Sequence, residues 1–190
     1  MNRKALVLVG ILFAIPMCLS AQEDGRLNMA TLLQISNSSI SNIGNIVRPK
    51  GFSLQHTREY ADTNRANTIT QEVIWGFRAT FDKENNRWLG TPSQNPSAIT
   101  IHLEKGKITP FQIVYNTNDV ALYNSFFNDL VRQGFKKVGE WIETSHIMTN
   151  FENEQTKQFI VLVEFIQGTG SAFKYVCHIG EKSEINTSKN

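Results

Sequence analysis

An apolar stripe that ends at a Gly-Phe pair and runs into alternating sequence occurs twice in this chain of 190 residues. The first copy ends in NIVRPKGFSL, residues 45–54, and the second ends in NDLVRQGFKK, residues 128–137. Apolar residues at spacings of three and four predict one face of a helix, and a following glycine can take the left-handed conformation that ends it. We therefore expect helices over about residues 29–47 and 120–131, followed by Gly51 and Gly134.

After each helix the hydrophobic period falls from about 3.6 to 2, which predicts a meander of strands. The expected strands are 52–58, 69–82, 97–104 and 107–115 in the first half, and 135–143, 145–152, 157–167 and 171–180 in the second. A helix with one apolar face needs a sheet to cover, and such a meander provides it. We expect an α+β fold of two tandem helix-plus-four-strand antiparallel units, residues 22–117 and 118–182, either separate or fused into one continuous sheet.

The first 21 residues have the pattern of a secretory signal peptide, because Arg3 and Lys4 precede a short apolar run that ends at Ser20 and Ala21. The run is shorter than the roughly 20 residues that a membrane span needs, so we expect no stable span. We expect cleavage after Ala21 and a secreted or periplasmic protein. In the alternative, Cys18 is the lipid-bearing first residue of a lipoprotein.

Removal of the signal peptide leaves a chain with no net formal charge. Of the 19 Lys and Arg residues, Arg3 and Lys4 leave with it, so 17 basic residues face 17 acidic ones. This balance argues against nucleic acid as a partner. Cys177 is then the only thiol, so no intramolecular disulfide is expected. Residues 183–190 are polar and are expected to form a disordered tail.

The two helices that end in Gly-Phe, each followed by a strand series, resemble the plan of the secreted beta-lactamase-inhibitor proteins. The same plan is similar to that of small bacterial periplasmic binding and envelope-assembly modules. The resemblance implies binding of proteins through a sheet face or through loops. The inhibitors carry disulfides in their units, whereas this chain keeps one cysteine, so no residue role is carried over.

Catalytic and metal signatures are weak along the whole sequence. Cys177 and His178 are adjacent, and neighbours on a strand point to opposite faces, so they are not expected to act as a nucleophile and its base. The other histidines, His56, His102 and His146, lack the short spacings of a zinc site. The paired acids lie among polar residues; these pairs are Glu140 with Glu143 and Glu152 with Glu154. We expect no enzyme activity, no metal and no cofactor.

The best candidate for a contact surface is Trp88, which lies in a long polar connection between residues 82 and 98. An aromatic ring in such a loop often contacts a partner. The binding residues predicted on this basis are Trp88, Asn86, Arg87 and Gln94. In the alternative, Trp88 folds back over a sheet edge as a lid. Gly76, in a strand-like segment, is expected to mark a bulge where a neighbouring chain approaches.

The function expected from these features is a secreted, non-catalytic binding or interaction module with an unknown protein or glycan as its partner. One alternative is a carbohydrate- or lipid-binding module that uses Trp88 and a sheet face. The other is a small hydrolase whose site is assembled only in the fold.

Overall fold

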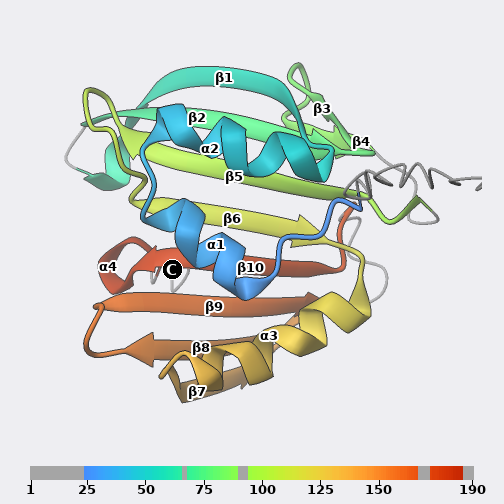
Figure 1. Ribbon diagram of the computed structural model, residues 1–190, viewed down its shortest axis with the longest axis vertical. Coiled ribbons are helices and arrows are strands. Elements are labelled where there is room, and N and C mark those ends of the chain that lie inside the picture. The colour runs from blue at the N-terminus through green and yellow to red at the C-terminus, as the bar shows by residue number, and fades with distance from the viewer. Residues whose placement is uncertain (1–23, 66–67, 90–93, 167–171, 186–190) are drawn as a thin grey trace, which may run out of the picture.

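One antiparallel sheet of eight strands organises the chain in the computed structural model, which describes residues 24–65, 68–89, 94–166 and 172–185 (Figure 1). Its strands are β1 (Ser53–Asp62), β2 (Thr68–Phe77), β5 (Ser97–Glu104), β6 (Gln112–Thr117), β7 (Lys136–Ile142), β8 (His146–Asn153), β9 (Gln158–Phe165) and β10 (Tyr175–Glu181). A small second sheet pairs β3 (Thr80–Asp82) with β4 (Arg87–Leu89). The helices are α1 (Met29–Ser36), α2 (Ile40–Val47), α3 (Val120–Arg132) and α4 (Lys182–Ile185), with 3-10 turns η1 (Arg48–Lys50) and η2 (Thr63–Arg65).

The strand order in the large sheet is β1-β2-β5-β6-β10-β9-β8-β7. The prediction of an α+β fold with an antiparallel sheet is confirmed, and the sheet is continuous. The two halves meet where β6 pairs with β10, for example at Tyr115 opposite Cys177. In each half a helix precedes four strands of the large sheet. Duplication of one unit stays a prediction, since shared element order alone does not establish it.

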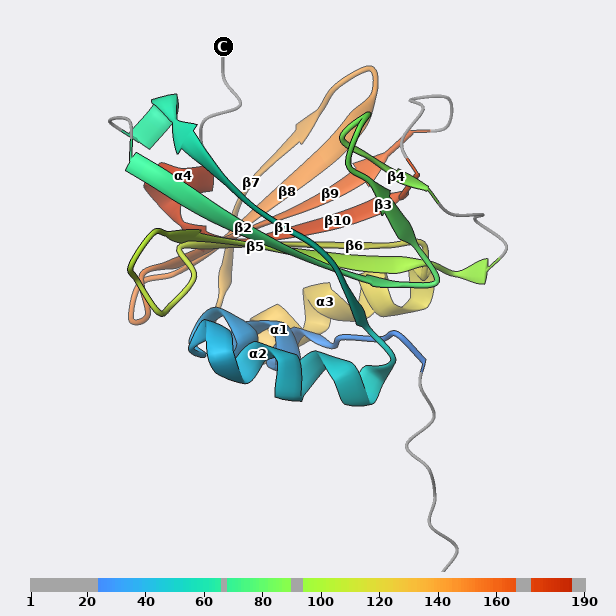
Figure 2. The same cartoon turned by 90° about the horizontal axis from the view of Figure 1, so that it is seen from above.

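Three helices cover one face of the sheet, while the β3–β4 hairpin and α4 lie on the opposite face (Figure 2). The main core fills the space between the sheet and α1, α2 and α3, because alternate residues of each strand point toward the helices. Its fully buried side chains include Leu32, Ile43, Phe126, Tyr115 and Ile160. The hydroxyl of Tyr115 donates a hydrogen bond to the carbonyl of Gly25, 3.1 Å away, which ties the N-terminal segment to the sheet.

The repeated Gly-Phe pair is a helix stop in both places. Gly51 and Gly134 have φ angles of 86° and 81°, in the left-handed region as predicted. The backbone N–H of each following Phe donates to a carbonyl in the last turn, Phe52 to Val47 at 3.3 Å and Phe135 to Leu130 at 3.0 Å. Both Phe side chains are buried in the core, so the pair ends the helix and anchors the start of the next strand.

The prediction of one helix over residues 29–47 is wrong, because α1 ends at Ser36 and a separate helix, α2, begins at Ile40. The side chains at the break take the helix carbonyls as hydrogen-bond acceptors. Asn37 Nδ2 donates to the carbonyl of Leu33, and Ser38 Oγ donates to that of Gln34, each at 2.8 Å. Such local bonds compete with the helical pattern and favour an early end.

Other boundaries also differ from the sequence-based expectations. The strand expected over 69–82 is interrupted at Arg78, whose φ of 51° turns the chain from β2 into β3. The strand expected over 107–115 begins only at Gln112, and the first strand extends to Asp62. The tail expected to be disordered from residue 183 is helical to Ile185, which is buried against β9 and β10. The signal peptide and residues 186–190 lie outside the described residues.

Candidate functional site

The polar connection that contains Trp88 is a β-hairpin, not a loop throughout. Arg78 redirects the chain after β2, β3 pairs with β4, and Phe81 lies opposite Trp88. The carboxylate of Asp82 accepts hydrogen bonds from the backbone N–H groups of Glu84 and Asn85, at 3.2 and 3.3 Å. These bonds hold the turn. Hydrogen bonds from Asn85, chiefly from its side chain, lower the pKa of Asp82. The prediction of a loop over 82–98 is therefore wrong for its first part, where β4 forms.

Trp88 packs within a small apolar cluster on the helix-free face. Its ring meets those of Phe81 and Phe173 edge to face, with centroids 5.2 and 5.8 Å apart. The cluster also contains Ala79 and Ala98, and the Trp88 side chain is half-buried. This position agrees with the alternative in which Trp88 folds back over the sheet as a lid. The ring contributes to holding the hairpin in place.

The other predicted binding residues do not gather around Trp88. Asn86 Oδ1 accepts a hydrogen bond from Arg58 Nη1 at 2.9 Å, so the hairpin turn is tied to β1. Arg87 lies beside the carboxylate of Asp82, at 3.5 Å. Gln94 lies at the rim of a pocket at the other end of the hairpin. The four residues therefore belong to separate contacts.

A charged cluster lies under the hairpin on the helix-free face. Arg58 Nε is 2.8 Å from Glu72 Oε1, and His102 Nδ1 is 3.7 Å from Glu72 Oε2. The Glu72 carboxylate is buried. Burial lowers the pKa of His102 despite the opposing effect of Glu72, so the imidazole is neutral near pH 7. Arg58 thus balances the buried carboxylate and reaches Asn86, which makes this cluster a support for the hairpin.

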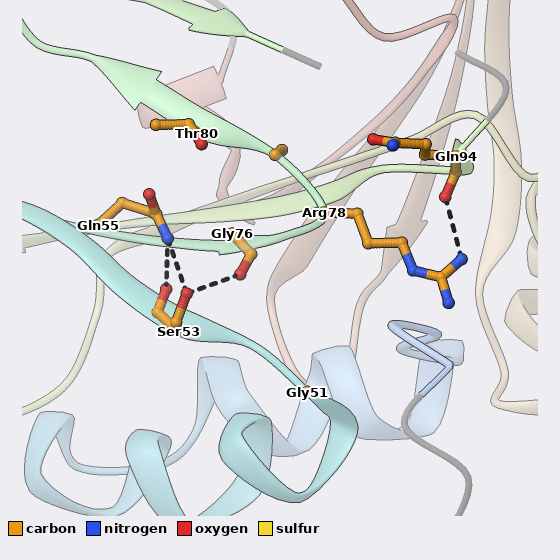
Figure 3. Close-up of a pocket in the computed structure, with 8 residues that line it drawn as sticks. Gly51, Ser53, Gln55, Gly76, Arg78, Thr80 and Gln94 are labelled. Atoms are coloured by element: carbon orange, nitrogen blue, oxygen red, sulfur yellow. Dashed lines mark hydrogen bonds between the residues drawn. The ribbon is translucent and has the colours of Figure 1, made fainter. Parts of the chain in front are cut away.

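An open pocket of about 750 Å³ lies where β1 begins, β2 ends and β3 leaves the sheet (Figure 3). Its lining residues are Gly51, Ser53, Gln55, Gly76, Arg78, Ala79, Thr80 and Gln94. The register of the sheet creates it, because Ser53 pairs with Gly76 and brings the helix stop beside the end of β2.

Gly76 is required at the pocket because the chain folds tightly over it. A Cβ atom at this position would lie 2.5 Å from the carbonyl oxygen of Ala79 and 3.2 Å from the Trp88 ring. The expected close approach at Gly76 is present, and its neighbours are Ala79, Gln55 and Trp88. The expected bulge at Gly76 is wrong, because Gly76 pairs regularly with Ser53 and Ala98 and the register shift lies in β1, between Leu54 and His56. The packing of Trp88 and the shape of the pocket are therefore linked.

The polar groups of the pocket come from two sides (Figure 3). On one side, Gln55 Nε2 donates to Ser53 Oγ at 2.7 Å, and Ser53 Oγ donates to the carbonyl of Gly76 at 3.4 Å. On the other side, Arg78 Nη1 donates to the backbone carbonyl of Gln94 at 3.2 Å. The Arg78 guanidinium also lies over the Phe77 ring, 4.8 Å from its centroid. These contacts orient the guanidinium but use one of its five N–H donors.

Among the described lining residues, Arg78 has the only charged side chain, and none of them carries a carboxylate, imidazole or thiol. Within the described parts of the chain, Arg78 has no ion-pair partner. Sequence reasoning found Gln94 and the special position of Gly76 but missed Arg78, Ser53 and Gln55. The signal for Arg78 is its place directly after Gly76-Phe77, where the strand pattern is interrupted.

Cys177, His178 and His56 lie in separate surroundings. Cys177 is buried in the core between sheet and helices, where burial raises the pKa of its thiol. His178 is the next residue along β10, and burial, with a smaller effect of His102, lowers its pKa to about 4. His56 stacks on Phe81, with ring centroids 6.1 Å apart. These positions bring no nucleophile beside a base.

The acidic pairs lie beside basic residues near the second half's strands. Nearest charged atoms are 2.6 Å apart in Glu140–Lys137, 3.7 Å in Glu143–His146, 3.1 Å in Glu152–Lys182 and 3.6 Å in Glu154–Lys136. Contact with Lys137 lowers the pKa of Glu140, which is a sign of an ordinary carboxylate and not of a general acid. Among the described residues, no group of three His, Cys, Asp or Glu is placed to hold a metal ion.

Comparison with family models, with curated proteins and with solved structures finds no match to this chain. In the described ranges, no helix has both the length and the apolar character that crossing a membrane requires. The pocket at the ends of β1 and β2 is therefore assessed on its own chemistry.

Proposed function

We propose that this protein is an exported, non-catalytic binding module that holds a polar group of its partner in the pocket at the ends of β1 and β2. The observation that carries the proposal is the composition of that pocket. Among the described lining residues it combines one oriented guanidinium with neutral hydrogen-bonding side chains, and the hydroxyls of Ser53 and Thr80 have no lining carboxylate or imidazole to activate them.

The rigid surroundings of the pocket support a role in binding. Gly51 comes from a helix stop, Ser53 and Gly76 from paired strands, and Arg78 from a fixed turn. A site built on such elements presents its polar groups in one arrangement, which limits the entropy lost on binding. Its volume of about 750 Å³ lies within the roughly 300 to 1,000 Å³ common for small-ligand pockets.

The proposal includes export, for which the support is the signal-peptide pattern in residues 1–21. The similarity in plan to secreted inhibitor proteins fits the same reading, because those proteins bind and do not catalyse. The binding site of this chain is the pocket and not the surface around Trp88, since the Trp88 ring packs against Phe81 and Phe173.

The test is an array of neutral and acidic oligosaccharides and peptides, screened with two variants of matched size. Thr80→Trp fills the pocket from an exposed position, whereas Thr144→Trp adds the same ring at an exposed turn between β7 and β8. We expect Thr80→Trp to weaken capture of the wild-type ligand at least about tenfold and Thr144→Trp to leave it unchanged.

Equal capture by both variants would show that the pocket is not the binding site. Turnover of an arrayed compound, lost on substitution of a single acid or histidine, would replace the binding function with the hydrolase alternative.

A further inference from the structure

We propose that the ligand of this pocket is an acidic saccharide, in which a sugar carboxylate meets Arg78 and the sugar hydroxyls meet the neutral side chains around it. This inference rests on the proposed binding function and adds the chemical class of the ligand. Three features of the pocket support it: its charge, its neutral polar groups and the lack of apolar lining.

Among the described lining residues, the pocket carries one positive charge, that of Arg78. Arg48 and Lys50 of η1 directly precede the lining residue Gly51 in the chain, and neither is among the described lining residues. In the described residues none of these three cations forms an ion pair; Arg48 only approaches the Trp75 ring, 5.5 Å from its centroid.

Two other arginines of the first half have a carboxylate beside them. Arg58 is paired with Glu72, and Arg87 lies beside Asp82. Arg78 instead contacts the carbonyl of Gln94 and the ring face of Phe77. These contacts position the guanidinium but do not neutralise its charge. A guanidinium held in this way can form two parallel hydrogen bonds to one carboxylate.

The neutral side chains favour a hydroxylated ligand. Ser53 and Thr80 provide hydroxyls, and Gln55 and Gln94 provide amides, so each can donate or accept. Sugar hydroxyls also both donate and accept. Ala79 has the only apolar side chain among the lining residues that the structure describes. A peptide ligand would instead need apolar or aromatic pockets for its side chains, because these supply most of the affinity of peptide and protein interfaces.

The backbone at Arg78 is consistent with a position kept for binding. Its φ of 51° is uncommon for a residue other than glycine and costs free energy. The side chain extends from this turn toward the backbone carbonyl of Gln94, on the side away from Ser53 and Gln55, as Figure 3 shows.

The test measures binding of trigalacturonic acid and of its fully methyl-esterified form by titration calorimetry. The two probes have the same rings and differ in charge. We expect the acid to bind at least about tenfold more tightly than the ester, the effect of a charge-assisted contact. Arg78→Gln should reduce this preference to about threefold or less, and Arg132→Gln, on exposed α3, should retain it. Thermal unfolding midpoints confirm that each variant is folded.

Equal binding of acid and ester, or an unchanged preference in Arg78→Gln, would overturn the assignment. So would tighter binding of a tri-glutamate peptide, or displacement of the sugar by sulfate at the same concentration. If neither sugar probe binds, but the wild-type protein captures another array ligand that Thr80→Trp does not capture, the acidic-saccharide class is refuted and the binding function stands. If Thr80→Trp loses nothing, the proposed function itself fails.

Discussion

Replacing Trp88 with alanine tests whether the β3–β4 hairpin is held by packing. Removing a fully buried tryptophan costs about 3 to 5 kcal/mol. Trp88 is half-buried, which reduces this contribution to roughly 2 kcal/mol, and its two edge-to-face ring contacts each add about 0.5 kcal/mol or more. We therefore expect Trp88→Ala to lower the free energy of unfolding by about 2 to 3 kcal/mol.

The matched control is Leu89→Ala, which changes the next residue on the same strand, whose side chain is 45% exposed. Its cost should stay within about 0.5 kcal/mol. Urea denaturation followed by circular dichroism gives both values, and for a domain of this size the thermal midpoint of Trp88→Ala should fall by about 4 to 10 °C. A midpoint within about 1 °C of the Leu89→Ala variant would refute the packing argument and return Trp88 to the list of candidate binding residues.

Three further predictions concern the helix stops and the buried groups of β10. Gly51→Ala and Gly134→Ala should each cost about 1 to 2 kcal/mol in urea denaturation, because both positions have left-handed backbone; unchanged midpoints would contradict this. The Cys177 thiol, buried and with a raised pKa, should react with a disulfide reagent only after unfolding, and rapid labelling of the native protein would show the core to be open. Burial lowers the pKa of His178 from 6.5 to about 4, so the unfolded chain takes up its proton first and stability should fall as pH drops from about 6.5 toward 4. His178→Gln should flatten part of this slope, to which His102 also contributes, and an unchanged slope would contradict the assignment.

The sequence was informative where one local interaction decides the structure. The stops at Gly51 and Gly134 followed from the need for a left-handed residue after an apolar stripe. The break after Ser36 was missed, because the apolar stripe continues across it while Asn37 and Ser38 bond to the preceding carbonyls. The hydrophobic period depends only on which residues are apolar, so it does not reveal side chains that compete for the backbone hydrogen bonds of a helix.

The candidate site was harder to predict because it depends on strand register. Ser53 and Gly76 are direct partners across β1 and β2, and that pairing places Gln55 on the same side of the pocket as Gly76. A shift of one residue would change every such neighbour. The prediction for Trp88 rested on local polarity, which does not reveal that Phe173, far along the chain, packs on its ring.

The single junction between β6 and β10 has a consequence for the order in which the chain can fold. Other neighbours in the large sheet follow one another within each half, so they can pair as soon as those segments exist. Helix α1, however, packs against β10 as well as β6 and α3. The helix made first therefore completes its contacts only with the last strand, and until then its buried stripe is open to water and to other chains. Export in the unfolded state, as the signal-peptide pattern predicts, would delay this step until both halves are present together.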